Sequence, residues 1–208
     1  IVPNAVHHNL PAWTIFAMFL IAIPLSNSIL KEKTEGSVFR LHTMPTPYLL
    51  LINGKILVYV MVCLIQFLLM LAVGKFLLPQ MGLPALVLGH SMMGIFILTM
   101  ATAFAATGFG VTVGTLATTD HQAAIMGSLS ILLLSALGGI WVPSYVMPEV
   151  MRNISAFSPL NWSLEGFYKL FLRGGGVEDI LPYAIKLMVF FFAMMGISYL
   201  ANHKKRTI

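Results

Sequence analysis

Charge is what this sequence has least of. Asp, Glu, Lys and Arg make up only 9% of the 208 residues, whereas hydrophobic residues make up 58%; a soluble domain carries roughly 25% charged residues. This composition excludes an ordinary soluble domain and predicts an all-α polytopic membrane protein. The twelve basic residues stand mostly at the ends of apolar segments. We therefore interpret the net charge of +5 as a membrane-topology signal and expect no nucleic-acid partner.

Cysteine is also scarce. Cys63 is the single cysteine and lies inside an apolar run, so no disulfide framework or cysteine metal site is expected. Acidic residues are missing from every predicted span, which argues against a proton-coupled carrier because such carriers usually use an intramembrane acid. The pair His7-His8 has no second ligand pair nearby and is interpreted as a solvated turn.

Two segments resemble catalytic motifs only in part. Asn53-Gly54-Lys55 matches the end of a phosphate-binding loop, but Leu49 stands where the loop needs its first glycine. Gly89-His90-Ser91 matches the start of a nucleophile elbow, but Met93 stands where the closing glycine should be. We therefore predict no catalytic, cofactor-binding or metal-binding residue in this chain, which is not expected to be an enzyme itself.

Long apolar runs dominate what is present. At about 1.5 Å per residue, roughly 20 residues cross the hydrocarbon core, and five runs are long enough. The predicted spans are residues 11–30, 56–74, 85–117, 123–142 and 180–200. Pro24 should kink the first of them, and the third is longer than a bilayer requires, so it should be tilted, broken or projecting into water. Because the chain begins at Ile1 without a signal segment, we expect it to be the C-terminal part of a longer protein. If the basic C-terminal tail is cytoplasmic, five spans place Ile1 outside, so we expect a sixth span upstream.

A charged, Pro- and Gly-containing segment, residues 31–55, separates the first two spans. Burying several unpaired charges in hydrocarbon is costly, so this segment is predicted to be a loop in water. Thr46 and Pro47 form a good helix start, so the second helix can begin before the membrane. If the basic tail at residues 203–206 is cytoplasmic, this loop is cytoplasmic too, because an even number of spans, four, lies between the loop and the tail.

Residues 143–179 form a second connection with helical periodicity. Ser158-Pro159 is a typical helix start, and an apolar face follows at four positions: Leu160, Leu164, Phe167 and Phe171. We predict two short amphipathic helices on the external side, lying in the membrane interface. The alternative is a loop that packs over the ends of the spanning helices.

Small residues recur every fourth position in the third span. The row consists of Thr102, Ala106, Gly110 and Gly114, which share one helical face. Small residues let a neighbouring helix approach closely, which is how helices associate in lipid. The stripe in the fourth span is a plausible partner, and it consists of Ala123, Gly127, Ser135 and Gly139. Packing within the chain is favoured over dimerisation as the role of this row.

Two stretches carry a resemblance to a known family. The first has the sequence EGSVFRL from Glu35 to Leu41, continues to Pro45 and ends at Gly54-Lys55. The second contains, in order, Gln122-Ala123-Ala124, Gly138-Gly139, Met147-Pro148-Glu149 and Ser158-Pro159-Leu160-Asn161-Trp162. Together they resemble the permease (membrane) subunits of type-2 ATP-binding-cassette transporters, over residues 30–175.

The resemblance implies a half-transporter membrane domain with six spans, the first absent here. It implies two such domains in a homo- or heterodimer, each bound through its first cytoplasmic loop to a nucleotide-binding ATPase subunit that holds ATP and Mg²⁺. By position, Glu35, Gly36, Arg40 and Pro45 belong to this coupling loop. Phe39 departs from the family, which commonly has an acidic residue there.

The charge pattern independently suits a protein partner. Lys31, Glu32 and Arg40 offer both signs of charge beside apolar residues 38, 39 and 41, which fits a groove with charged margins. We therefore add Glu32 to the predicted ATPase-coupling residues. The alternative is a solvated loop that obeys the positive-inside rule.

The sequence thus predicts a permease subunit of an ATP-driven exporter in a bacterial plasma (inner) membrane. The family places the substrate path between two membrane domains, lined largely by the first and fourth spans. Their apolar character hints at a lipid-like or amphipathic cargo. The competing hypotheses are an ATP-independent channel or carrier and a membrane scaffold subunit without transport activity.

Overall fold

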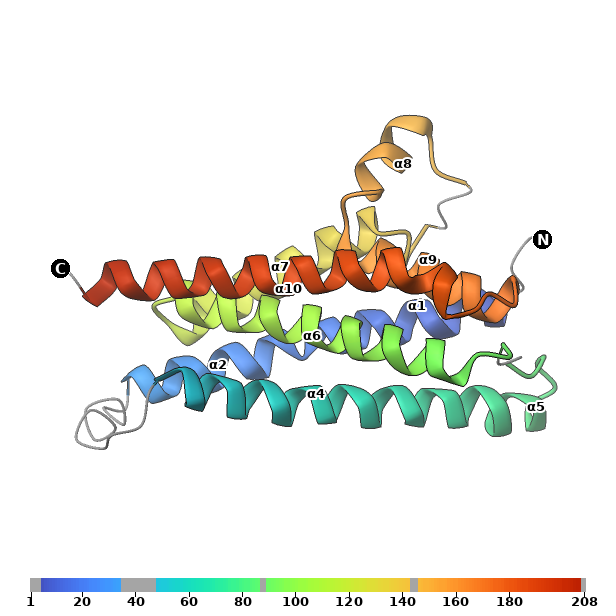
Figure 1. The fold of residues 1–208 in the computed structure, drawn as a ribbon, viewed down its shortest axis with the longest axis horizontal. Coiled ribbons are helices and arrows are strands. Elements are labelled where there is room, and N and C mark those ends of the chain that lie inside the picture. The colour runs from blue at the N-terminus through green and yellow to red at the C-terminus, as the bar shows by residue number, and fades with distance from the viewer. Residues whose placement is uncertain (1–4, 35–47, 87–88, 143–145, 207–208) are drawn as a thin grey trace.

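The computed structural model describes residues 5–34, 48–86, 89–142 and 146–206, and these residues form helices and turns without a strand. The helices run along one elongated bundle (Figure 1). Within the described residues, five helical segments are long and apolar enough to cross a membrane: His8–Glu32, Leu50–Gln80, Met92–Leu116, Asp120–Leu137 and Val177–His203. The all-α polytopic membrane class is therefore confirmed.

The first span consists of two helices, α1 (Ala5–Leu20) and α2 (Ala22–Thr34), which meet at a turn at Ile21. Pro24 has no N–H, so it cannot donate the usual helical hydrogen bond to the carbonyl of Leu20. The N–H of Ile21 donates to the carbonyl of Met18 at 3.4 Å, three residues back. The predicted kink at Pro24 is thus a break between two helices.

The second span begins with α4 (Tyr48–Ala72), continues through a π-helical turn, η1 (Val73–Leu77), and ends in α5 (Leu78–Gln80). A π turn contains one residue more than an α turn and disturbs the regular hydrogen-bond ladder. Here the carbonyl of Gly74 accepts a hydrogen bond from the N–H of Leu86 at 3.0 Å. The chain that follows α5 is thereby attached to the helix it has just left.

The third span, α6 (Met92–Leu116), begins at Ser91, whose hydroxyl accepts from the N–H of Gly94 at 3.1 Å. It therefore starts later than the predicted Ala85. The fourth, α7 (Asp120–Leu137), is capped by Thr119, whose Oγ1 accepts from the N–H of Gln122 at 3.2 Å. It ends before the predicted Val142.

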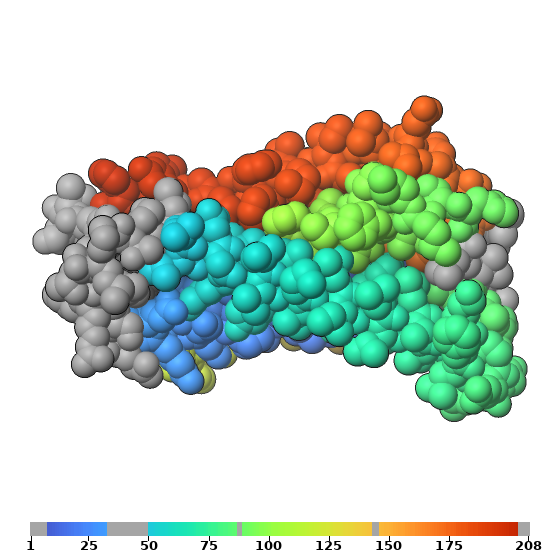
Figure 2. All heavy atoms as spheres, turned by 60° about the horizontal axis from the view of Figure 1, so that its bottom comes forward, coloured from blue at the N-terminus to red at the C-terminus, as the bar shows by residue number. Residues whose placement is uncertain are grey.

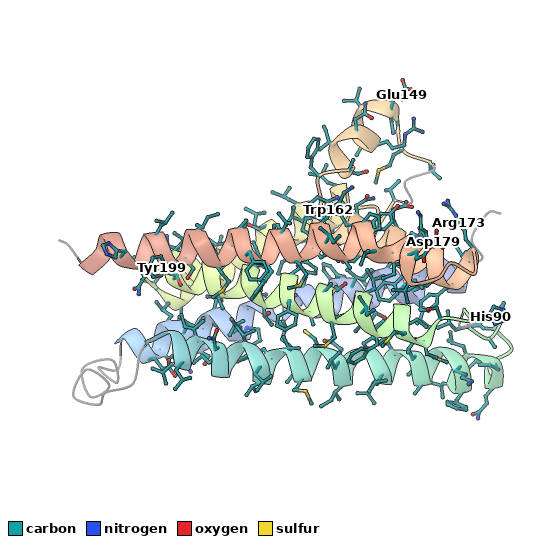
Figure 3. All side chains as sticks on the ribbon, in the orientation of Figure 1. His90, Glu149, Trp162, Arg173, Asp179 and Tyr199 are labelled. Carbon is teal, nitrogen blue, oxygen red and sulfur yellow. The ribbon has the colours of Figure 1, made fainter. Side chains whose placement is uncertain are left out.

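Two short helices, α8 (Glu149–Ser155) and α9 (Pro159–Leu172), precede the fifth span, α10 (Val177–Arg206). α8 stands away from the bundle, with Glu149 at its tip (Figure 3). The apolar face of α9 is buried, because α9 packs among α1, α6 and α10. For α9 the structure favours the packing alternative, whereas α8 keeps its apolar side chains exposed, Val150 at 70%.

The third span lies at the centre of the bundle. α6 contacts α10 and α2 most extensively, and it also touches α1, α4 and α9. Hydroxyl groups tie α6 to α10: Thr112 donates to the carbonyl of Met194 at 2.8 Å, and the hydroxyls of Thr115 and Ser198 lie 2.8 Å apart. α1 begins and α10 ends at opposite ends of this bundle (Figure 1).

Candidate coupling end and helix interfaces

The predicted ATPase-coupling residues lie around the connection between α2 and α4. Of these residues, the structure describes Glu32. The other four lie outside the described residues: Glu35, Gly36, Arg40 and Pro45. α2 ends, α4 begins and α10 ends at the same end of the bundle (Figure 1). We call this the coupling end, defined by residues 28–34 of α2, 48–55 of α4 and 199–206 of α10.

Lys55 joins the two helices that flank the connection. Its Nζ lies 2.9 Å from Oε1 of Glu32, and it donates to the carbonyl of Ser28 at 2.9 Å and to its hydroxyl at 2.8 Å. These three acceptors match the three hydrogens of an ammonium group. The Lys55 side chain is only 15% exposed and that of Glu32 is 41% exposed. The pair is therefore partly shielded from water, and removing one partner would leave the other charge partly buried without its partner.

This arrangement gives Glu32 a partner within the same chain, where the sequence analysis had assigned it to an ATPase contact. Lys55 was missed as a site residue. The two residues are far apart in sequence, and neither helical periodicity nor a motif links them. The only available signal was that both lie where a charged segment meets an apolar one.

α2 lies directly on α6 at two glycines of the predicted small-residue row. A Cβ atom on Gly110 would stand 2.9 Å from Cα of Ala22. A Cβ on Gly114 would stand 2.9 Å from both Cα and the carbonyl oxygen of Ser26. At these positions only glycine permits backbone contact between the helices.

The other two residues of the row also face elements of this chain. Thr102 donates a hydrogen bond to the hydroxyl of Ser163 in α9 at 3.1 Å, and Ala106 is fully buried. The predicted partner, the stripe in α7, is wrong for this row, because Gly110 and Gly114 meet α2. In α7, a Cβ on Gly127 would instead lie nearest to Ile23 of α2, at 3.4 Å.

Aromatic side chains connect the first and fourth spans away from the coupling end. The ring of Trp13 lies 5.8 Å from that of Phe16, and the ring of Trp141, just beyond α7, lies 6.4 and 6.5 Å from these two. Trp13 is 49% exposed and Trp141 is 53% exposed. α1 and α7 thus share an aromatic surface, and these are the two spans that the resemblance assigned to the substrate path.

Comparison with known proteins agrees with the resemblance in the sequence. The model of the ABC-2 type transporter family matches residues 3–172. The inner membrane transport permeases YhhJ of Escherichia coli (strain K12) and of Shigella flexneri are each 27% identical over 206 residues, which is 93% of this chain and 52% of each relative. The chain thus spans about half the length of these curated relatives. Since the family match covers most of its residues, the protein belongs to the ABC-2 type transporter family.

Proposed function

We propose that this chain is the membrane permease part of an ATP-driven exporter, in which two permease domains form the substrate path and separate ATPase subunits supply the energy. The observation that carries this proposal is the family match over residues 3–172. The names of the relatives, inner membrane transport permeases, support transport as the activity and a bacterial inner membrane as the location.

The contacts at the coupling end suggest how a movement of the ATPase subunit would be transmitted to the membrane helices. A force on residues 35–47 would act on α2 and α4 together, because Lys55 binds Glu32 and Ser28. α2 would pass the displacement to α6 through the close contacts at Gly110 and Gly114. The break at Ile21 would let α2 move against α1, since a helix with an interrupted hydrogen-bond ladder bends more easily.

The aromatic surface of α1 and α7 is the candidate face of the substrate path. The exposed rings of Trp13 and Trp141 and the partly buried ring of Phe16 offer apolar area and, for Trp, an N–H donor. Such a face suits a lipid-like or amphipathic cargo. A second permease domain docked along α1 and α7 would enclose this surface between the two domains.

The test uses the full-length protein together with a candidate ATPase subunit, sought first in the neighbouring reading frame. We expect the two to co-purify and the permease, in lipid nanodiscs, to change the rate of ATP hydrolysis. The exchange Glu35→Arg with Arg40→Glu should uncouple this hydrolysis from transport. Transport that is undiminished without any ATPase would overturn the proposal in favour of a channel or carrier.

A second measurement tests the orientation. Single cysteines placed in residues 35–47 should react with membrane-impermeant reagents only after the cells are opened, because the proposed ATPase partner is cytoplasmic. Labelling from outside intact cells would place the coupling end on the wrong side and contradict the proposal. With that outcome, the alternative of a membrane scaffold subunit without transport activity would be tested next, by asking which proteins assemble with the chain.

A further inference from the structure

A widely open cavity of about 430 Å³ lies between the first and second spans. Its lining consists of Ala17, Leu20, Ile21 and Pro24 of the first span and Val62, Ile65, Gln66 and Leu69 of α4. Leu20 is the middle residue of the span His8–Glu32, and Ile65 is the middle residue of the span Leu50–Gln80. Both line the cavity, which therefore lies near the centre of the membrane. Figure 2 views the molecule from the side of α4, with α1 and α2 emerging along its edge.

The helix break interrupts the hydrogen-bond ladder at residues that line this cavity. Pro24 cannot donate to the carbonyl of Leu20, and the N–H of Ile21 bonds Met18 in place of Ala17. Ala17, Leu20, Ile21 and Pro24 all line the cavity. Irregular backbone is tolerated at membrane depth where it is buried in protein or lines a cavity, and the carbonyls of broken helices bind substrates or ions in many transporters.

Gln66 of α4 adds a polar side chain to the lining of this cavity. It lines the cavity and has no hydrogen-bond partner in the part of the chain that the structure describes. A side-chain amide at membrane depth is costly unless its donors and acceptor are satisfied. The rest of the lining is apolar and carries no charge.

We propose that this cavity binds a neutral, drug-sized molecule with an apolar body and a hydroxyl group. Its volume lies within the range of small-molecule sites, roughly 300–1,000 Å³. The hydroxyl would donate to a carbonyl at the helix break and accept from the amide of Gln66. A charged ligand is disfavoured because no opposite charge lines the site to offset its desolvation. The site lies within one chain, apart from the aromatic surface of α1 and α7.

The experiment compares two photoreactive probes on the full-length protein in nanodiscs: octanol bearing a diazirine, and the matching octane without the hydroxyl. Labelled residues are mapped by mass spectrometry. The alcohol should label residues 17–24 and 62–69 more strongly than the alkane, and excess octanol should suppress this labelling. The assay requires no ATPase, so it can fail while the proposed transport function stands.

Two variants test the polar groups from opposite sides of the cavity. Gln66→Leu removes the amide, and Pro24→Ala restores an N–H that can occupy the carbonyl of Leu20. Each should lower the preference for the alcohol about three- to tenfold, the effect of losing one hydrogen bond. Gln80→Leu, at the end of the same span and outside the cavity, should leave the preference unchanged. Circular dichroism and size-exclusion chromatography establish that each variant is folded.

Two outcomes would overturn the proposal. Equal labelling of these residues by both probes would mean that the cavity is a lipid-filled groove without a site for a hydroxyl. No labelling there by either probe would mean that another helix, from a second copy or from elsewhere in the protein, covers it.

Discussion

α6 and α4 are both membrane-length helices, but they occupy opposite environments. In the most apolar 18-residue stretch of each span, 61% of the residues are buried for α6 and 22% for the span that contains α4. Yet the α4 span has the higher mean hydropathy. Lipid tails are as apolar as leucine, so hydropathy does not select the centre of a membrane bundle; small and hydroxyl residues do.

The contrast between the buried α6 and the exposed α4 is tested most strongly at the small residues of α6. We expect Gly110→Leu to destabilise the protein by about 3 kcal/mol, because overpacking at a helix contact forces the backbones apart. The matched control is Gly196→Leu in α10, where an added Cβ meets nothing within 4 Å. Unfolding in a detergent titration measures both. Equal losses would show that α2 does not approach α6 as closely as described.

Large side chains on the two helices should respond differently to truncation. Leu98→Ala in α6 removes a fully buried side chain and should cost about 3 kcal/mol through the cavity it leaves. Leu68→Ala in α4 removes a side chain that is 63% exposed and should cost less than about 0.5 kcal/mol. The same detergent titration measures both, and a large cost at Leu68 would mean that a protein partner covers that face of α4.

At the coupling end, Lys55→Met should lower stability by about 1 to 2 kcal/mol, since Glu32 and Ser28 lose their donor. Lys75→Met, an exposed lysine near the other end of the same span, is the control and should change stability little. A double-mutant cycle with Glu32→Gln isolates the pair. Additive effects of the two substitutions would show that Lys55 and Glu32 do not interact.

The aromatic surface of α1 and α7 should give the smallest change. Aromatic pairs contribute about 0.5–1.5 kcal/mol beyond burial, and these rings are half exposed. In a cycle of Trp13→Ala and Trp141→Ala, we expect a coupling energy of about 0.5 kcal/mol, from the same unfolding measurement. The proposed function adds that either substitution should reduce transport more than it reduces stability.

Much of this fold could be predicted because hydrocarbon imposes simple rules on a sequence. Runs without charge gave the membrane class, and Pro24 marked a disturbed helix. The sequence does not predict in the same way which helix packs against each helix face. The row through Gly110 and Gly114 predicts a close neighbour but not which one, because α2 and α7 both offer small residues. The face of α9 at Leu164 and Phe167 has the same pattern whether lipid or protein covers it.

The candidate site was harder to predict than the fold. Glu32 lies in α2 and Lys55 lies in α4. Their pairing therefore depends on how these two helices pack against each other. Gln66 is a single polar residue in a long apolar run, and its meaning depends on the break in α1 and α2 on the facing side. Both features arise only when segments distant in the sequence come together.

The π turn at Val73–Leu77 makes the second span sensitive to length in a particular way. Removing one residue there would restore an unbroken α-helix, and the helix would still be long enough to cross a membrane. The π turn takes up its extra residue within the turn, so the face that the following residues present would stay nearly the same. The change would lie in the hydrogen-bond ladder: the carbonyl of Gly74 now accepts from the N–H of Leu86, and a regular α-helix would direct that carbonyl along its own axis. In this span the extra residue therefore creates an attachment point for the chain that follows, and the length of the span is secondary.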